Sequence, residues 1–509
     1  MVPVLIPSFL LVITLISGLV TWRDYEISWL RWVYISAAAA AWIIFGLISS
    51  GETPVFLAVD PEIPGSLGIP QPGFIFDSIS KPMLMVLSGI LLVCALDAEI
   101  SNRWKSWVFA LGGASMLGVL AADVYTVLLS WAAIDLIWMY YDLRFIAINQ
   151  STPREMVSYA VRLLGPGLLI VPGLAGIESE FTYLLNEIEP MSAVFLVIAS
   201  FFRLGVWFSS PETIEPDPEQ KKVDLNLVIL PSAVSVVYLI RSAAAVQPVN
   251  LPPGLVYLGG GLLILLALFQ MFFKTDRSGK SYWLLGVVGL VISSLVLQQE
   301  STAVILGPLL LGTGYLLIWQ KNAAFPDWIV IASAAVCLLP LPYFPGWPIQ
   351  ELISGGLPGI VMGGGMGLFL AGAFRVFITS NGSISESKQV SLFAVPGIAV
   401  LILTQLIVLF SSEYGSSVLL MDILPGFLMM AAAGIVGFRF YHKQQIDLDQ
   451  GFLRNGLLWG EKIFVYLIGS IINKMVRYIE KLLEGSAGLL WTLLIGFLIL
   501  TLITVGGGG

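Results

Sequence analysis

The sequence has little charge and almost no histidine. Only 11% of its 509 residues are charged, and His442 is the single histidine. Soluble globular proteins carry about 25% charged residues, so the composition argues against a soluble fold. The two cysteines, Cys94 and Cys337, lie in apolar runs without CxxC spacing or a nearby histidine, which argues against a zinc or iron–sulfur site. No glycine motif for a nucleotide stands out. We therefore expect no metal, no cofactor and no nucleic-acid partner.

Apolar residues are abundant instead. They form 57% of the chain, and the mean hydropathy is +0.90. A run of about 20 mostly apolar residues can cross a bilayer, and such runs predict an all-α membrane bundle of about 14–16 transmembrane helices, some of them broken. The runs are 3–21, 32–49, 82–97, 106–121, 123–142, 158–177, 190–208, 225–245, 254–273, 282–298, 302–319, 328–345, 357–378, 391–411, 417–440 and 487–505. Because no basic leader or cleavage site precedes the first run, we expect it to be retained.

One stretch near the C-terminus has a different pattern. Between 462 and 483, four basic residues alternate with apolar residues at helical spacing. This pattern predicts an amphipathic helix that lies at the membrane interface or along a partner. The basic residues are Lys462, Lys474, Arg477 and Lys481.

Basic residues also alternate between successive loops. Loops that follow odd-numbered runs are basic, whereas the even-numbered loops and their helix ends hold only Lys81 and Arg241. Basic loops stay in the cytoplasm, so the alternation predicts a multi-pass protein of a prokaryotic inner membrane with its N-terminus outside. Cytoplasmic loops include those near Arg103, Arg154, Lys221 and Arg277.

Several short motifs occur in a fixed order on this pattern. They are Phe74-Ile-Phe-Asp-Ser-Ile-Ser80, Ala122-Asp-Val-Tyr-Thr-Val-Leu-Leu-Ser-Trp131, Phe201-Phe-Arg-Leu-Gly205, Val237-Tyr-Leu-Ile-Arg241 and Leu339-Pro-Leu-Pro-Tyr-Phe-Pro-Gly-Trp347. Together they resemble the antiporter-like membrane subunits of respiratory complex I, multisubunit cation/proton antiporters and membrane-bound hydrogenases. The resemblance covers about residues 70–380. It implies a subunit of a larger assembly whose partners are other integral membrane subunits and the lipid bilayer.

This resemblance suggests three parts of the chain. Residues 1–105 would form N-terminal transmembrane helices, and 106–411 the antiporter-like transmembrane core. Residues 412–509 would hold the C-terminal spans with the amphipathic interfacial helix 462–483.

The sequence departs from the family at the residues that carry protons. Pumping members of the family place titratable residues on the fifth, seventh, eighth, eleventh and twelfth helices. Intramembrane charges are costly and usually functional, so their loss is informative. The corresponding positions here are Ala132, Arg203, Val228, Leu310 with Gly314, and Gln350. An arginine does not release its proton, so a continuous proton relay is not expected.

The remaining charges are the candidate site residues. Asp135 lies one turn after Ala132 and can partly replace the missing glutamate. Asp135, Arg203 and Glu351 are interpreted as remnants of an ion path. We predict that Arg203 and Asp135 pair, because each unpaired charge at that depth would cost roughly 2.5–3.5 kcal/mol. The pair would be either structural or gating, and Glu351 either a remnant site or a loop charge.

Two further carboxylates have a structural interpretation. Asp77 and Asp123 stand where helices begin. A carboxylate there caps free backbone N–H groups and interacts favourably with the helix dipole.

These observations lead to one hypothesis and two alternatives. The hypothesis is a non-catalytic antiporter-like subunit with a degenerate proton path and a structural or conformation-transmitting role. It could belong to a redox-driven complex that translocates protons. The first alternative is an active proton or cation carrier that uses Asp135, Arg203 and Glu351. The second is an unrelated secondary transporter.

Overall fold

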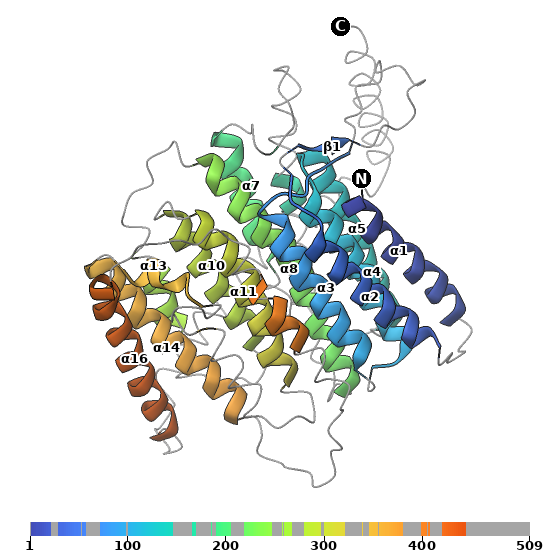
Figure 1. The fold of residues 1–509 in the computed structure, drawn as a ribbon. Coiled ribbons are helices and arrows are strands. Elements are labelled where there is room, and N and C mark those ends of the chain that lie inside the picture. Colours follow the sequence, from blue (N-terminus) through green and yellow to red (C-terminus); the bar gives the residue numbers. More distant parts are fainter. Residues whose placement is uncertain are drawn as a thin grey trace, which may run out of the picture.

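Helices make up almost all of the regular structure in this computed structural model (Figure 1). The predicted all-α class is therefore confirmed. The structure describes residues 2–21, 29–51, 53–56, 72–97, 100–145, 165–168, 185, 190–204, 218–246, 257, 259–266, 279–296, 300–320, 338, 346–354, 356–379, 399–404, 406–407 and 420–443.

The helices follow the apolar runs of the sequence. The exception is the five-residue helix Ile349–Ile353; the others are long enough for most of their backbone N–H groups to bond within the same segment, which a lipid environment requires. Their bounds are α1 (Val2–Thr21), α2 (Leu30–Leu47), α3 (Ser80–Leu96), α4 (Asn102–Leu120), α5 (Val124–Phe145), α7 (Pro190–Arg203), α8 (Pro218–Val246), α10 (Gly279–Val296), α11 (Glu300–Gln320), α13 (Ile349–Ile353), α14 (Leu357–Thr379) and α16 (Leu420–Lys443).

Two short strands interrupt the helical pattern near one end of the bundle, and the sequence did not predict them. Strand β1 (Val55–Phe56) pairs antiparallel with β2 (Gly73–Phe74). An isolated bridge joins Phe74 to Ala121, between α4 and α5. The hairpin therefore ties the chain before α3 to the α4–α5 connection.

The helices pack in neighbouring pairs around a shared apolar core. Helix α1 packs on α4, α2 on α3, α7 on α8, and α10 on α11, while α4 and α11 also contact α8. Helix α3 is buried on nearly every side. Helices α14 and α16 lie together at the edge of the bundle opposite α1 and α2 (Figure 1).

Apolar side chains also point outward from the bundle. On α1, Leu5, Phe9, Val12 and Ile16 are all more than half exposed and recur at helical spacing. An apolar face of this kind suits lipid or a protein partner better than water. Among the described residues, Leu30–Leu47 is the helix that is both long and apolar enough to cross a membrane, and the apolar parts of the others are shorter.

The predicted and observed helix bounds agree within a few residues for most described helices. Helix α8 is an exception, because it begins at Pro218 rather than at 225. Its first turns carry Glu219, Lys221 and Lys222, which an apolar-run rule excludes although they are compatible with a helix. The predicted helix 487–505 and the amphipathic segment 462–483 lie outside the described residues. Most of the predicted runs 158–177, 254–273, 328–345 and 391–411 also do.

Candidate functional site

An ion pair joins α5 and α7 inside the bundle. Arg203 ends α7, and its Nη1 donates hydrogen bonds of 2.8 and 2.7 Å to the two carboxylate oxygens of Asp135 on α5. The Arg203 side chain is 3% exposed and that of Asp135 is 25% exposed. The predicted pairing of these two residues is confirmed. Ala132, where the family resemblance places a glutamate, is exposed instead.

Arg203 is held by more than its counter-ion. Its Nη2 donates to the backbone carbonyl of Trp131 at 3.2 Å, and its guanidinium lies 5.1 Å from the centre of the Trp131 ring. Its stem passes Gly165, where a Cβ would come within 2.6 Å of Arg203 Cγ. A glycine is therefore needed at 165 for this arrangement. The carboxylate, the carbonyl and the ring together fix the guanidinium, because charge-assisted hydrogen bonds and cation–π contacts both constrain its position.

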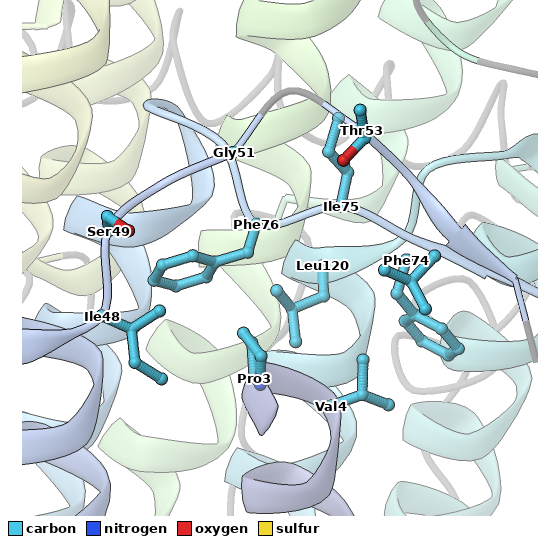
Figure 2. Close-up of a pocket in the computed structure, with 11 residues that line it drawn as sticks. Pro3, Val4, Ile48, Ser49, Gly51, Thr53, Phe74, Ile75, Phe76 and Leu120 are labelled. Carbon is cyan, nitrogen blue, oxygen red and sulfur yellow. The ribbon is translucent and has the colours of Figure 1, made fainter. Parts of the chain in front are cut away.

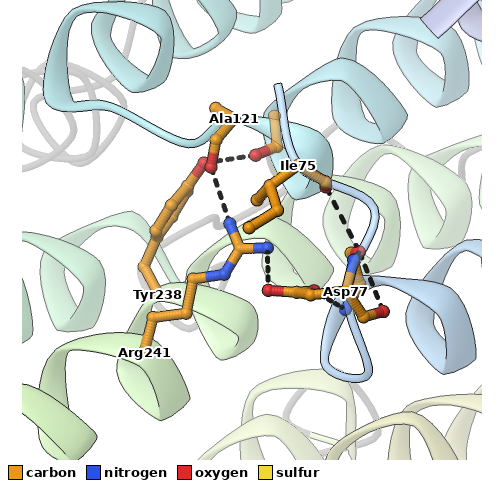
Figure 3. Close-up of polar contacts among 7 residues, drawn as sticks. Ile75, Asp77, Ala121, Tyr238 and Arg241 are labelled. Atoms are coloured by element: carbon orange, nitrogen blue, oxygen red, sulfur yellow. Dashed lines mark hydrogen bonds and ion pairs between the residues drawn. The ribbon is translucent and has the colours of Figure 1, made fainter. Parts of the chain in front are cut away.

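A second ion pair lies near the hairpin and was missed by the sequence reasoning (Figure 3). Arg241 on α8 donates from Nη2 to Asp77 Oδ2 at 2.9 Å and from Nη1 to the carbonyl of Ala121 at 2.6 Å. Both side chains are largely buried, at 6% exposed for Arg241 and 15% for Asp77. The sequence suggested only that each charge stands at the end of a helix.

Asp77 also has the capping role that the sequence predicted. Its Oδ1 accepts from the Ser80 backbone N–H at 2.7 Å, and its own N–H donates to Ser80 Oγ at 2.9 Å. These reciprocal bonds satisfy backbone donors that the first turn before α3 would otherwise leave free. One carboxylate thus caps a helix and pairs with Arg241.

Asp123 caps α5 in the same way. Its Oδ1 accepts from the Thr126 N–H at 2.7 Å, and its Oδ2 accepts from the Thr126 hydroxyl and the Gly73 N–H, both at 2.6 Å. The bond to Gly73 extends the cap to β2. Asp123 is therefore a structural charge that joins the hairpin to α5.

Backbone hydrogen bonds also join the segment before α3 to the connection between α4 and α5. The N–H of Ile75 donates to the carbonyl of Leu120 at 2.7 Å, and that of Ala122 donates to Gly73 at 2.9 Å. The hydroxyl of Tyr238 on α8 donates to the carbonyl of Gly118 at the end of α4. Through Tyr238 and Arg241, helix α8 therefore forms hydrogen bonds with the end of α4 and with the connection between α4 and α5.

Apolar residues stand at the positions on α8 and α11 where the family resemblance places proton carriers. Val228 and Leu310 are buried. Trp283 Nε1 on α10 donates to the carbonyl of Leu310 at 2.7 Å, and its indole lies against Gly314, where any added Cβ would overlap it. The Phe369 ring lies 5.5 Å from that of Trp283, measured between centres. The Trp283 ring therefore packs against this part of α11.

Glu351 belongs to a different part of the bundle. It lies in the first turn of α13 and accepts a hydrogen bond from the Thr302 hydroxyl at the start of α11. It is partly buried, whereas its neighbour Gln350 is fully buried. Glu351 is thus on α13, whereas the Arg203–Asp135 pair joins α5 to α7.

One described hollow lies beside the hairpin, and it is apolar (Figure 2). Its volume is about 200 Å³, and Pro3, Ile48, Phe74, Phe76 and Leu120 are among its lining residues. None of the described residues that line it is charged. In the described part of the chain, no three His, Cys, Asp or Glu residues are grouped so that they could hold a metal ion.

Two solved structures are similar to this chain over nearly its whole length. The first is a chain of the Mrp complex from Dietzia sp. DQ12-45-1b, with a TM-score of 0.67, 15% identity and coverage of 99% of this chain and 63% of that one. The second is a chain of the membrane-bound sulfane sulfur reductase, an archaeal respiratory membrane complex. Its TM-score is 0.62, with 13% identity and coverage of 97% of this chain and 99% of that one.

The present chain therefore spans less than two thirds of the Mrp complex chain that it matches. No protein-family model and no curated protein matches the sequence. At these identities the likeness shows the fold. The resemblance inferred from the motifs is confirmed at that level, because the chain has the fold of subunits from multisubunit membrane complexes.

Proposed function

We propose that this chain is an integral membrane subunit of an antiporter-like multisubunit complex and that its own role is structural or conformation-transmitting. Both matched chains come from complexes, which supports a subunit with membrane partners. The observation that carries the finer proposal is the closed Arg203–Asp135 pair. Arg203 stands where the family resemblance puts a lysine, and Asp135 lies one turn after Ala132, where it puts a glutamate.

The closed pair is poorly suited to moving protons. A relay group must both bind and release a proton, and an arginine guanidinium stays protonated in proteins. Both carboxylate oxygens of Asp135 accept a hydrogen bond from Arg203, so the guanidinium occupies the carboxylate. The pair therefore behaves as a fixed charge contact rather than as an exchanging site.

The packing around α11 is a second argument against proton transfer through this chain. A proton could cross a gap between titratable groups through water held by polar side chains. Leu310 and Gly314 are instead covered by the Trp283 indole, whose one donor is used by the Leu310 carbonyl. This aromatic packing supports the proposal that side chains fill the space in which a proton path along α11 would run.

The remaining parts of the proposal concern the orientation of the chain in the membrane and the extent of its antiporter-like core. The basic-loop pattern supports a prokaryotic inner membrane with the N-terminus outside. Residues 106–411 are proposed as the antiporter-like core, with the bilayer and other membrane subunits as surroundings. Helices α1 and α2 pack directly on α4 and α3, so the N-terminal part belongs to the same bundle.

The test is a flux measurement on the purified chain in liposomes. A pH-sensitive dye inside the vesicles would report proton entry under an imposed membrane potential, and sodium would be tested in parallel. We expect no flux above that of empty liposomes. Flux that Asp135→Asn abolishes would overturn the proposal. Flux that appears only in the intact assembly and survives Asp135→Asn would place the pump in a partner.

One observation favours the alternative of an active carrier. Glu351 is a partly buried carboxylate hydrogen-bonded to Thr302 beside a helix break. Broken helices often line binding sites in transporters. In the same assay, a flux that Glu351→Gln reduces would support this alternative. The fold match to chains of multisubunit complexes supports the proposed subunit over an unrelated secondary transporter.

A further inference from the structure

The two buried ion pairs are connected through two aromatic side chains. We infer that Trp131 and Tyr238 couple the pairs, so that opening the Arg203–Asp135 pair loosens the contacts of Arg241 at the hairpin junction. This inference rests on the conformation-transmitting role proposed above and supplies a route for it. The hairpin junction denotes residues 72–77 together with 118–123.

The first half of the connection lies on α5. Trp131 and Asp135 are one helical turn apart and so share a face of the helix. Arg203 contacts both of them, through the carboxylate of Asp135 and through the carbonyl and ring of Trp131. A guanidinium that leaves the carboxylate therefore also changes its position on the indole.

The second half lies on α8. Tyr238 and Arg241 are also one turn apart on a shared face. The Tyr238 ring meets the Trp131 ring edge-on, with centres 6.1 Å apart and planes at 88°. The Tyr238 hydroxyl binds the Gly118 carbonyl, and Arg241 binds the Ala121 carbonyl. Both residues thus hold the same α4–α5 connection.

Tight packing leaves little room for the rings to move independently. Trp131 is 1% exposed and Tyr238 is 0% exposed. Helices α4 and α8 approach closely at Gly118, where a Cβ would lie 2.9 Å from Val234 Cγ1. Close-packed interiors transmit displacement because they contain few voids that could absorb it. A shift of the Trp131 indole is therefore expected to reach Tyr238 and the hairpin junction.

Charge strengthens the effect of such a shift. The Arg241 side chain is 6% exposed, and its ion pair with Asp77 is made at 2.9 Å. A buried charge-assisted hydrogen bond weakens steeply as its geometry degrades. A small displacement of α8 would therefore weaken the bond that holds the cap of α3.

The experiment is hydrogen exchange by mass spectrometry on the full chain in lipid nanodiscs. The reporters are the amides of Ile75 and Ala122, whose bonds cross the hairpin junction. Asp135→Asn should raise their exchange by about fivefold or more, the lower end of usual coupling between two sites. In a Trp131→Leu background, adding Asp135→Asn should raise it by less than about twofold, because the connection is already cut.

Two comparisons separate coupling from general loosening. Tyr282→Phe removes a buried tyrosine bond to a carbonyl, that of Phe369 at 2.8 Å, and should leave the junction amides unchanged. Peptides from α14 should exchange alike in the unmodified chain and in the Asp135 and Trp131 variants, which leave the Tyr282–Phe369 bond intact. If Trp131→Leu does not fold, Tyr238→Phe replaces it. This change keeps the ring, loses the bond to Gly118 and should reduce the effect of Asp135→Asn.

Three results would overturn the inference. They are unchanged exchange at the junction in Asp135→Asn, an undiminished effect of Asp135→Asn in the Trp131→Leu background, and an equal rise in α14. The flux assay remains independent of these results. Proton flux with intact coupling would overturn the proposed function alone, whereas no flux and no coupling would leave a static scaffold and overturn this inference alone.

Discussion

The Arg203–Asp135 pair allows a quantitative test of how the bundle tolerates charge. Asp135→Leu leaves the Arg203 guanidinium without its counter-ion at a position where the side chain is only 3% exposed. Stranding one member of a buried ion pair costs about 3–5 kcal/mol of unfolding free energy. The contacts with the Trp131 carbonyl and ring remain, so we expect a value near the lower end of this range.

The opposite substitution should cost less. Arg203→Met strands Asp135, whose side chain is 25% exposed and therefore less buried than that of Arg203. We expect a loss of about 2–3 kcal/mol, because insertion scales give similar values for a central aspartate. The double variant removes both charges, and its cost should be only about 0–2 kcal/mol since no charge is left unpaired.

The measurement is a double-variant cycle in mixed micelles titrated with SDS. The two single losses should exceed the loss in the double variant by well over 1 kcal/mol, which gives the interaction energy of the pair. Tyr282→Phe serves as a reference for one neutral buried hydrogen bond, with an expected loss of about 1 kcal/mol. Single losses that add up to the double loss within about 0.5 kcal/mol would refute the reasoning.

Three other predictions use packing and topology. Gly165→Ala should lower the free energy of unfolding by about 1–3 kcal/mol, because the added methyl group overlaps the Arg203 side chain. Gly167→Ala is the control, because its methyl group meets no other atom and should cause no such loss. Equal losses for the two variants in the same SDS titration would contradict this prediction. Gly363→Ala should destabilise similarly, because its Cβ meets the Gly426 carbonyl on α16, whereas Gly364→Ala meets only a flexible methionine. Equal unfolding midpoints for that second pair would argue against close α14–α16 contact. Single cysteines in the predicted cytoplasmic loops should resist an impermeant thiol reagent in intact cells, and labelling at any two loops would overturn the proposed orientation. The loops are those near Arg103, Arg154, Lys221 and Arg277.

Most of the described helices and the first ion pair could be predicted from the sequence. The predicted run 3–21 corresponds to the helix Val2–Thr21, and the predicted run 357–378 corresponds to the helix Leu357–Thr379. These predictions succeed because the length of an apolar run and the need to satisfy backbone groups are local properties. Arg203 and Asp135 could be paired from sequence because two deep charges in an apolar bundle have few other ways to be neutralised.

The second ion pair and the packing of Trp283 against α11 could not be predicted in this way, because both join segments that are far apart or on different helices. Arg241 and Asp77 stand 164 positions apart, and each sequence neighbourhood is explained by a helix end alone. The sequence around Gly314 does not predict that an indole covers this residue, because Trp283 belongs to a different helix, α10. Such contacts depend on which helix faces rest against one another. Periodicity shows that a face is apolar, but the partner of each face is chosen by the combined packing of all the helices.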